Sequence, residues 1–413
     1  NVLMPRVTGD EQAGVVSRIL FVLCGIGLNL APSIYFAYVN VYASTMHATV
    51  LAWMSLSLMG AGFAVVCLQM LLDWYFDRLY GAKTTYSFRI GIGLLGLGVV
   101  LIIIPFATQF EHVLWLGICV GIFGGATMAS LNQMASVVHT TFTKYVATGM
   151  TIGQGLPIPL SLILDFGSAD ASRSTRIVFA WLPAFLCLAT FIVFSLMTCS
   201  CGNFDATFSS MDSAQGAETE AGADDQEAAP LIPPALATGT AAGTASHAWW
   251  FQWPVSGCAI MQFVANGLAM FLMPFFTYFG GAQLAHELML VRFGGELLGR
   301  VASHYIRLWD WGLLNEKGLV GLLVITGIRA AMLVVLMMSV FGVMNLGGAH
   351  ILMGSVAVFY LLFAWSQSEV MVLVVQTGPK HKKVELMRGM TLLMFTGQII
   401  AAIAAIILQD STK

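Results

Sequence analysis

The sequence predicts an all-α protein that crosses a membrane many times, and its composition and hydropathy are the observations that predict it. Of the 413 residues, 58% are hydrophobic and only 9% are charged, whereas a soluble domain carries about 25% charged residues. The mean hydropathy is +0.83. The apolar runs are continuous rather than alternating, which favours spanning helices over an outer-membrane barrel. This composition excludes a soluble enzyme, an extracellular disulfide domain and a disordered scaffold.

Eleven apolar segments are long enough to cross a bilayer, for which a helix needs about 20 residues. A polar segment divides them into six and five. The first six are expected at 17–43, 48–71, 88–106, 112–138, 145–165 and 177–200. The last five are expected at 250–278, 286–306, 319–344, 349–377 and 388–409. The sequence therefore predicts a six-helix bundle over 1–200 and a five-helix bundle over 250–413.

The polar segment between the bundles, residues 201–249, has a composition of its own. It holds seven acidic residues and no Lys or Arg, and it is rich in Ala, Gly, Ser, Thr and Pro. Such a segment cannot bury enough apolar surface to offset its ordering entropy, so we expect a disordered linker. Glu227, Leu231 and Ile232 fit an acidic dileucine sorting pattern. Because so short a pattern often arises by chance, the plasma membrane and the endolysosomal membranes both stay open.

The distribution of basic residues predicts the orientation in the membrane. With a cytosolic N-terminus, twelve of the 18 Lys and Arg residues, Lys144 among them, lie on the cytosolic side and three on the opposite side. Cytosolic loops of membrane proteins carry an excess of Lys and Arg. We therefore expect a cytosolic N-terminus, a cytosolic linker and an external C-terminus in a multi-pass integral membrane protein.

Charged residues inside the second bundle are the first candidates for a functional site, because a charge within a bilayer is costly unless it is paired or hydrated. Arg292, Glu296 and Arg300 follow one another at intervals of four and therefore share one helix face. They form either an ion pair that locks this helix to the other bundle or a polar wall that binds a solute. Arg329 and Glu369 are expected to face the same cavity or to form a gate or coupling pair.

Polar and small residues mark the first bundle. Gln133 has an amide that can both donate and accept, as recognition of a base or sugar edge requires. Small residues allow helices to approach closely, so we expect packing roles for five glycines: Gly25, Gly27, Gly153, Gly155 and Gly299. For Gln154, between two of these glycines, packing is favoured over solute contact.

Several kinds of chemistry have no signature in the sequence. There is no nucleotide-binding P-loop, no His or Cys cluster with metal spacing and no catalytic constellation. We therefore expect neither an enzyme nor a bound cofactor or metal. A net charge of −3 is too small to indicate a nucleic-acid partner. The expected partners are a small solute and the lipid bilayer.

Motifs in both bundles resemble the equilibrative nucleoside transporter family, solute carrier family 29. They are Gly25-Ile-Gly27, Gly153-Gln154-Gly155, Glu296-Leu-Leu-Gly299-Arg300, Arg329 and Gln376-Thr-Gly-Pro379-Lys380, in the family's order. The family's six-plus-five architecture, cytosolic linker and external C-terminus match those expected above. Where the family has Pro-Trp-Asn in the first span, this chain has Ala31-Pro32-Ser33, and Glu296 replaces an Asp. The chain therefore resembles a divergent member.

The resemblance implies a fold similar to the major facilitator architecture, with a solute site near the midplane between two rocking bundles. It implies facilitated diffusion of a nucleoside or nucleobase, contacted by Ser33, Gln133, Glu296 and Arg300. Two alternatives stay open. One is proton-coupled transport of another polar solute, with Glu296 or Glu369 carrying the proton. The other is a non-transporting membrane subunit of a larger assembly.

Overall fold

The protein, described by a computed structural model, is helical in almost all of the residues that the structure describes. The structure describes residues 9–38, 42, 50–138, 142–166, 172–200, 261, 264–265, 287–288, 290–306, 318–340, 348–377 and 383–411. The expected linker 201–249, its sorting pattern and most of the expected span 250–278 lie outside these residues. So do the last three residues of the Gln376–Lys380 motif.

Helices from residue 9 to residue 200, here called the first half, cover all six of the expected first spans. They are α1 (Gly9–Ala37), α3 (Val50–Tyr80), α4 (Ala82–Ile103) with the 3-10 turn η1 (Ile104–Phe106), α5 (Phe110–Val138), α6 (Phe142–Gly155), α7 (Pro157–Ile163) and α8 (Arg173–Ser200). The fifth span consists of α6 and α7, because Pro157 interrupts the helix two residues beyond Gly155.

The described residues from 287 onward, here called the second half, hold four further helices. Residues 290–305 are helical, followed by α11 (Gly318–Val340), α12 (Ala349–Thr377) and α13 (Lys383–Ser411). They correspond to the expected eighth to eleventh spans. By length and composition, eight of the described helices can cross a membrane, six in the first half and two, α12 and α13, in the second.

The turn between α3 and α4 is much tighter than hydropathy predicts. The expected spans end at 71 and resume at 88, but α3 continues to Tyr80 and α4 begins at Ala82. Gly81 makes the turn alone with φ +76°, a left-handed conformation that suits glycine. The charges of this segment lower its hydropathy without breaking the helix, so a hydropathy window places the helix ends too early.

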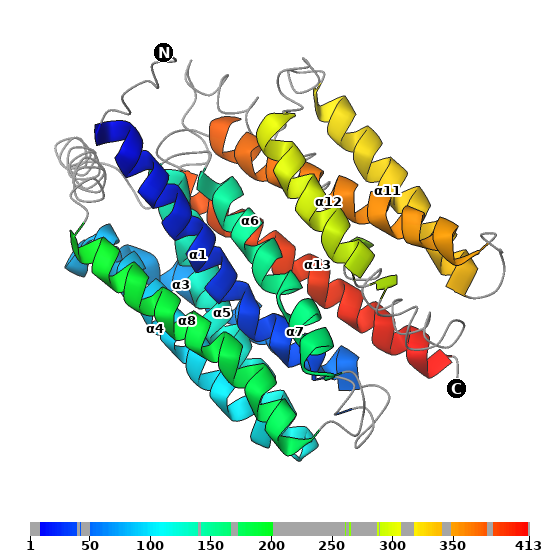
Figure 1. Cartoon of the computed structure of the whole chain (residues 1–413). Helices are drawn as coiled ribbons and strands as arrows, with labels where there is room; N and C mark the ends of the chain where they lie inside the picture. The colour runs from blue at the N-terminus through cyan, green and yellow to red at the C-terminus, as the bar shows by residue number, and fades with distance from the viewer. Residues whose placement is uncertain are drawn as a thin grey trace, which may run out of the picture.

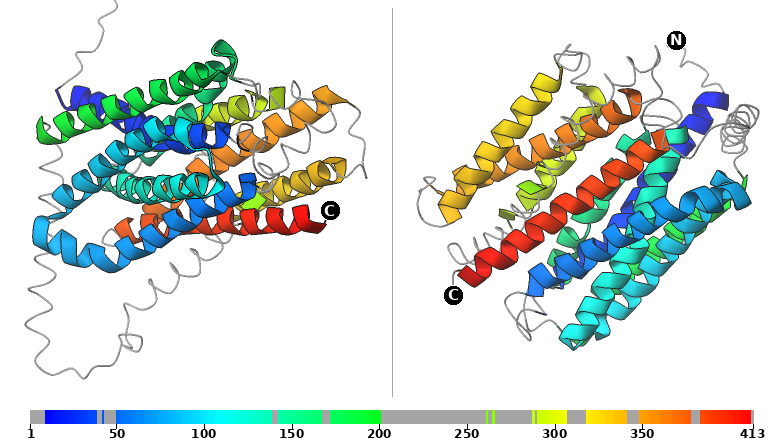
Figure 2. Two further views of the ribbon diagram at one scale, coloured as in Figure 1. Left: turned by 90° about the horizontal axis from the view of Figure 1, so that it is seen from below. Right: turned by 180° about the vertical axis from the view of Figure 1, so that it is seen from behind.

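The two halves lie side by side, and the long helices of each run alongside one another (Figure 1). The helix α13 of the second half packs along α3 and also contacts α5 of the first half, as the view from behind shows (Figure 2). The ring of Phe395 on α13 approaches Gly62 of α3, where a Cβ would leave it no room. One large apolar core fills the first half, and a smaller one around Phe359 and Val356 lies in the second.

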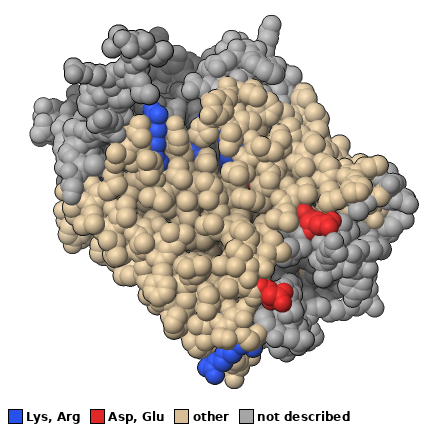
Figure 3. Space-filling view, viewed as in Figure 1, with Lys and Arg blue, Asp and Glu red and all other residues tan. Residues whose placement is uncertain are grey.

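The outer surface is apolar, as a lipid-facing surface must be. Large side chains such as Leu71, Trp115 and Phe185 point outward, with 78%, 65% and 61% of their surface exposed. Figure 3 shows a face on which the described residues are almost all uncharged. Seven charged side chains of the described residues are instead buried between helices, and their contacts are described next: Asp73, Lys144, Arg292, Glu296, Arg300, Arg329 and Glu369.

Candidate functional site

Arg300 is held on several sides by polar groups from both halves. Its Nε donates to Thr151 Oγ1 of α6 at 3.3 Å. Its Nη1 donates to the Ala364 carbonyl at 3.2 Å and to Ser368 Oγ at 2.9 Å, and its Nη2 donates to Gln367 Oε1. The side chain is buried with 6% exposure. These donors cross from the 290–305 helix to α6 and α12, so Arg300 joins three helices at once.

Arg292 and Glu296 form an ion pair one turn away, with Arg292 Nε 3.3 Å from Glu296 Oε1. The Arg292 guanidinium also lies over the Tyr360 ring, 4.9 Å from its centroid. Gln154 of α6 reaches this pair from the first half. With its amide nitrogen toward the carboxylate, Gln154 donates to Glu296 Oε2 at 3.2 Å and its oxygen accepts from Arg292. The expected ion pair is present, and both of its members contact the opposite half.

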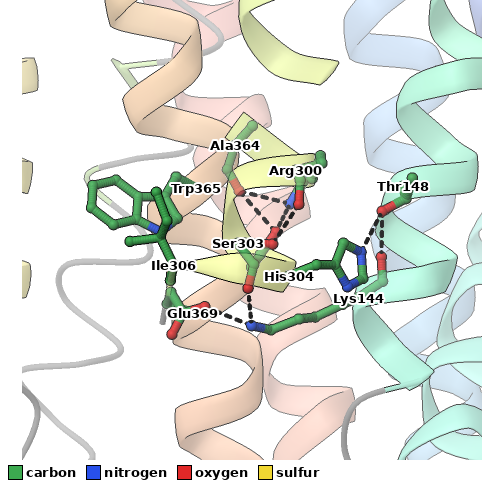
Figure 4. Close-up of polar contacts among 10 residues, drawn as sticks. Lys144, Thr148, Arg300, Ser303, His304, Ile306, Ala364, Trp365 and Glu369 are labelled. Carbon is green, nitrogen blue, oxygen red and sulfur yellow. Dashed lines mark hydrogen bonds and ion pairs between the residues drawn. The ribbon is translucent and has the colours of Figure 1, made fainter. Parts of the chain in front are cut away.

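A second ion pair, which does join the two halves, is formed by Lys144 of α6 and Glu369 of α12 (Figure 4). Lys144 Nζ lies 2.6 Å from Glu369 Oε1 and also donates to the Ser303 carbonyl at 2.6 Å. Both side chains are buried, at 5% and 4% exposure. Beside them, Thr148 Oγ1 lies 3.2 Å from His304 Nε2. Lys144 was expected just outside the span 145–165, but it lies inside α6, which begins at residue 142. Its expected place on the cytosolic side stays a prediction.

Arg329 of α11 is only 1% exposed, and two aromatic rings of α12 lie against it. Its guanidinium carbon lies 4.4 Å from the Phe359 ring centroid and 4.6 Å from that of Phe363. Cation–π contact is a way to hold a cation in an apolar environment. The structure thus places Arg329 against α12, the helix that also carries Glu369.

The two first-half candidates, Gln133 and Ser33, have different surroundings. Gln133 of α5 is 1% exposed, and its Oε1 has no hydrogen-bond partner among the described residues. A buried amide oxygen without a partner is unusual, so it is a candidate to accept from a solute. Ser33 donates to the Asn29 carbonyl of its own helix at 2.7 Å. Asn29 in turn donates to the Met150 carbonyl of α6 at 2.8 Å.

Glycines bring α1 and α6 into backbone contact. A Cβ at Gly25 would collide with the Val146 carbonyl, and one at Gly153 would collide with the Ile26 carbonyl. Gly27 instead faces side chains of α4 and α8. The close approach fixes the position of α6, the helix from which Lys144 and Gln154 extend.

Glycines also allow contacts around the 290–305 helix. A Cβ at Gly155 would overlap the ring of Phe293, and one at Gly299 would collide with the Leu361 carbonyl of α12. The backbone of α6 next to Gln154 therefore lies directly against the neighbour of Arg292.

A charged cluster that the sequence analysis did not single out lies where α3, α4 and α13 meet. Asp73 of α3 pairs with Arg89 of α4 and Arg388 of α13, and it is only 1% exposed. Arg388 Nη2 also lies 3.9 Å from Asp77 Oδ2. Burial and the nearby Asp73 raise the pKa of Asp77 to about 6. The spacing of two Asp residues four apart was the available signal, but hydropathy placed this segment in a loop.

Comparison with known proteins supports the fold. No known protein family matches this chain by sequence profile, and no curated protein matches it by sequence. These comparisons therefore do not support membership of the nucleoside transporter family. A solved structure of the major facilitator superfamily proton:xylose symporter XylE, bound to 6-bromo-6-deoxy-D-glucose, is similar, with a TM-score of 0.62 and 9% sequence identity. The similarity covers 97% of this chain and 90% of the symporter chain.

An identity of 9% makes this a likeness of fold. It agrees with the helices, the apolar surface and the contacts between two halves described above. The predicted fold class, an all-α multi-pass membrane protein with a major-facilitator-like architecture, is confirmed. Within the described residues, six of the expected spans lie in the first half and four in the second.

Proposed function

We propose that this chain is a membrane transporter that moves a nucleoside or nucleobase by alternating access, as facilitated diffusion. The observation that carries the proposal is the buried polar junction between the halves, formed by Arg292, Glu296, Arg300, Thr151 and Gln154. Buried charges inside a membrane protein mark solute or ion pathways. Donors and acceptors from both halves at one place are what a solute bound between two moving halves requires.

The two halves, residues 1–200 and 250–413, act in this proposal as bodies that rock against each other around the junction. The ion pair of Lys144 with Glu369 and the cluster of Asp73 with Arg388 tie the halves together at the end predicted to be cytosolic. These contacts support an arrangement in which the cytosolic end is closed. Gln133, with its buried amide oxygen, is assigned to the solute from the first half, and Ser33 lies in the same half.

Proton-coupled transport of another polar solute is the second candidate. The observation that favours it is the pair of buried carboxylates, Glu296 and Glu369, each of which contacts the opposite half. A carboxylate whose partner leaves during the cycle can take up a proton. The fold neighbour is described as a proton:xylose symporter, so a sugar belongs among the solutes to be tested. On this reading the solute is small and polar, and a proton accompanies it.

Uptake in cells that lack endogenous nucleoside transport tests the proposal. Radiolabelled uridine, adenosine, hypoxanthine and xylose are offered at two external pH values to cells that express the wild type, Arg300→Ala or Glu296→Gln. Glu111→Gln, at an exposed position of α5, is the matched control. Uptake of a nucleoside that is lost in the first two variants supports the proposal, and dependence on pH favours the proton-coupled form.

Two results argue against it. Uptake of xylose alone moves the assignment to a sugar. No uptake of any solute, with the chain present at the cell surface, favours a non-transporting subunit, which copurification with partner proteins then tests. The membrane in which the chain resides is followed in the same cells by fluorescence.

A further inference from the structure

The carboxamide of Gln154 is bound as a ligand would be bound. Its nitrogen donates to Glu296 Oε2 at 3.2 Å, and its oxygen accepts from Arg292. With the amide reversed, the oxygen would face the carboxylate and the nitrogen would face the guanidinium, so the charges fix one orientation. The ion pair thus presents a donor, the Arg292 guanidinium, beside an acceptor, the Glu296 carboxylate. A planar group that carries an acceptor next to a donor can bind to both.

A flat group of this kind has the pattern O=C–N–H. Primary carboxamides have it, and so do the lactam and imide edges of uracil and hypoxanthine. Hydrogen bonds to charged groups are stronger than neutral ones and depend on direction, so the pair of charges discriminates between such edges and groups that lack the donor. Gln154 belongs to the first half, whereas Arg292 and Glu296 belong to the second.

The surroundings favour a rigid subsite with an occupant that can be exchanged. Arg292 and Glu296 are 6% and 4% exposed, and Arg292 is held over the fully buried Tyr360 ring. Gln154 is only partly buried. The Tyr360 hydroxyl has no hydrogen-bond partner among the described residues, which leaves one more polar atom on a residue at the subsite. The close packing of Gly155 on Phe293 holds the backbone of α6 against this helix, so the Gln154 amide is positioned at the pair.

We propose that Arg292 and Glu296 form a binding subsite for an amide or lactam edge of the solute, and that Gln154 occupies this subsite when no solute is bound. The proposal rests on the proposed function in that the solute is a transported one. A solute with an O=C–N–H edge replaces the Gln154 amide and removes a contact between the halves in the same step. Solute binding is thereby coupled to release of the first half from the second.

Uridine and 3-methyluridine test the subsite, because the added methyl group removes the N–H donor of both lactam edges and leaves the sugar unchanged. Equilibrium binding of each to the purified full chain in nanodiscs is measured together with uptake. Loss of a hydrogen bond to a buried carboxylate predicts that 3-methyluridine binds about 10- to 100-fold more weakly. The difference in affinity between uridine and 3-methyluridine is expected to be smaller in Glu296→Gln, because its neutral side chain is a weaker acceptor.

Gln154→Ala separates an internal occupant from a packing residue. Without the competing amide, uridine is expected to bind several-fold more tightly, and acetamide, which matches the deleted atoms, is expected to compete with uridine in this variant more strongly than in the wild type. Gln109→Ala, at an exposed position before α5, is the matched control. A packing role predicts weaker binding and no effect of acetamide. Size-exclusion profiles of each variant report on folding.

The outcomes distinguish the two proposals. Equal binding of uridine and 3-methyluridine, or no binding of uridine, overturns the subsite. Uptake of uridine, with equal binding of uridine and 3-methyluridine, supports the proposed function and overturns the subsite. Preferential binding of uridine without uptake of any solute supports the subsite and overturns transport.

Discussion

The ion pair of Lys144 with Glu369 predicts how strongly the two halves are held together at the end that is predicted to be cytosolic. The pair is buried, with Nζ and Oε1 2.6 Å apart, and Lys144 makes a second bond to the Ser303 carbonyl. Glu369→Gln leaves the ammonium buried without its counter-charge while the halves are together, whereas separation of the halves exposes it to water. Removal of one partner of a buried pair costs about 3–5 kcal/mol. At the lower end, this shifts the equilibrium between closed and open forms by about 100-fold.

Distances between spin labels at Tyr80 and Tyr305 measure this shift. Both side chains are exposed, at 63% and 83%, and they lie in different halves. Both labels are introduced in a background without native cysteines. The wild type is expected to show the short distance of the closed form, and Glu369→Gln a longer distance. The double variant Lys144→Met/Glu369→Leu is expected to recover part of the short distance, because apolar groups of similar volume often replace a buried ion pair at little cost.

Glu111→Gln is the control for these distances, since it removes an exposed carboxylate from α5. The reasoning is refuted if Glu369→Gln gives the same distance distribution as the wild type while the protein stays monodisperse. In that case the ion pair contributes nothing to closure, and the neighbouring contacts alone hold the two ends together.

Two further predictions concern the helix contacts and the charged cluster. Gly149→Leu places a side chain against the Val22 carbonyl, so it is expected to lower the free energy of unfolding by about 1–3 kcal/mol or to prevent folding. Gly60→Leu, whose side chain enters open space, is the control and is expected to leave stability unchanged. Equal thermal midpoints of the two variants would contradict the close contact of α1 and α6. Asp77 has a pKa raised from 3.8 to about 6, so its contribution to the closed arrangement is present below about pH 4 and lost as pH rises through 6. The distance between labels at Tyr80 and Tyr305 is expected to lengthen between about pH 4 and 6, and to lengthen less in Asp77→Asn. An identical pH profile in the variant would exclude Asp77 as the group that causes the change.

Much of the fold follows from hydropathy alone, because a bilayer demands long apolar helices whatever their neighbours are. Helix ends are less predictable. The extension of α3 to Tyr80 and the start of α6 at residue 142 carry polar residues that a hydropathy window assigns to loops. For this reason Lys144 was expected just outside the fifth span, and Asp73 was not considered.

The candidate site was predictable only where its residues share one helix. The spacing of Arg292, Glu296 and Arg300 predicts a common face, and the pair of Arg292 with Glu296 follows from it. The partners of these residues come from other helices, and periodicity contains no information on which helices meet. Gln154 is the clearest example, since packing was favoured for it but its amide contacts both members of the pair.

The position of α13 against α3 and α5 has a consequence for how the chain is made. These first-half helices are synthesised before α13. The face of α3 that carries Asp73 and Gly62 therefore lacks its α13 contacts until α13 is made. Until Arg388 and Phe395 are made, the Asp73 carboxylate and the surface at Gly62 face lipid or the membrane's assembly factors. A nascent chain that stops before Lys383 carries this unfinished face, which is a feature by which cellular quality control can distinguish it from the completed protein.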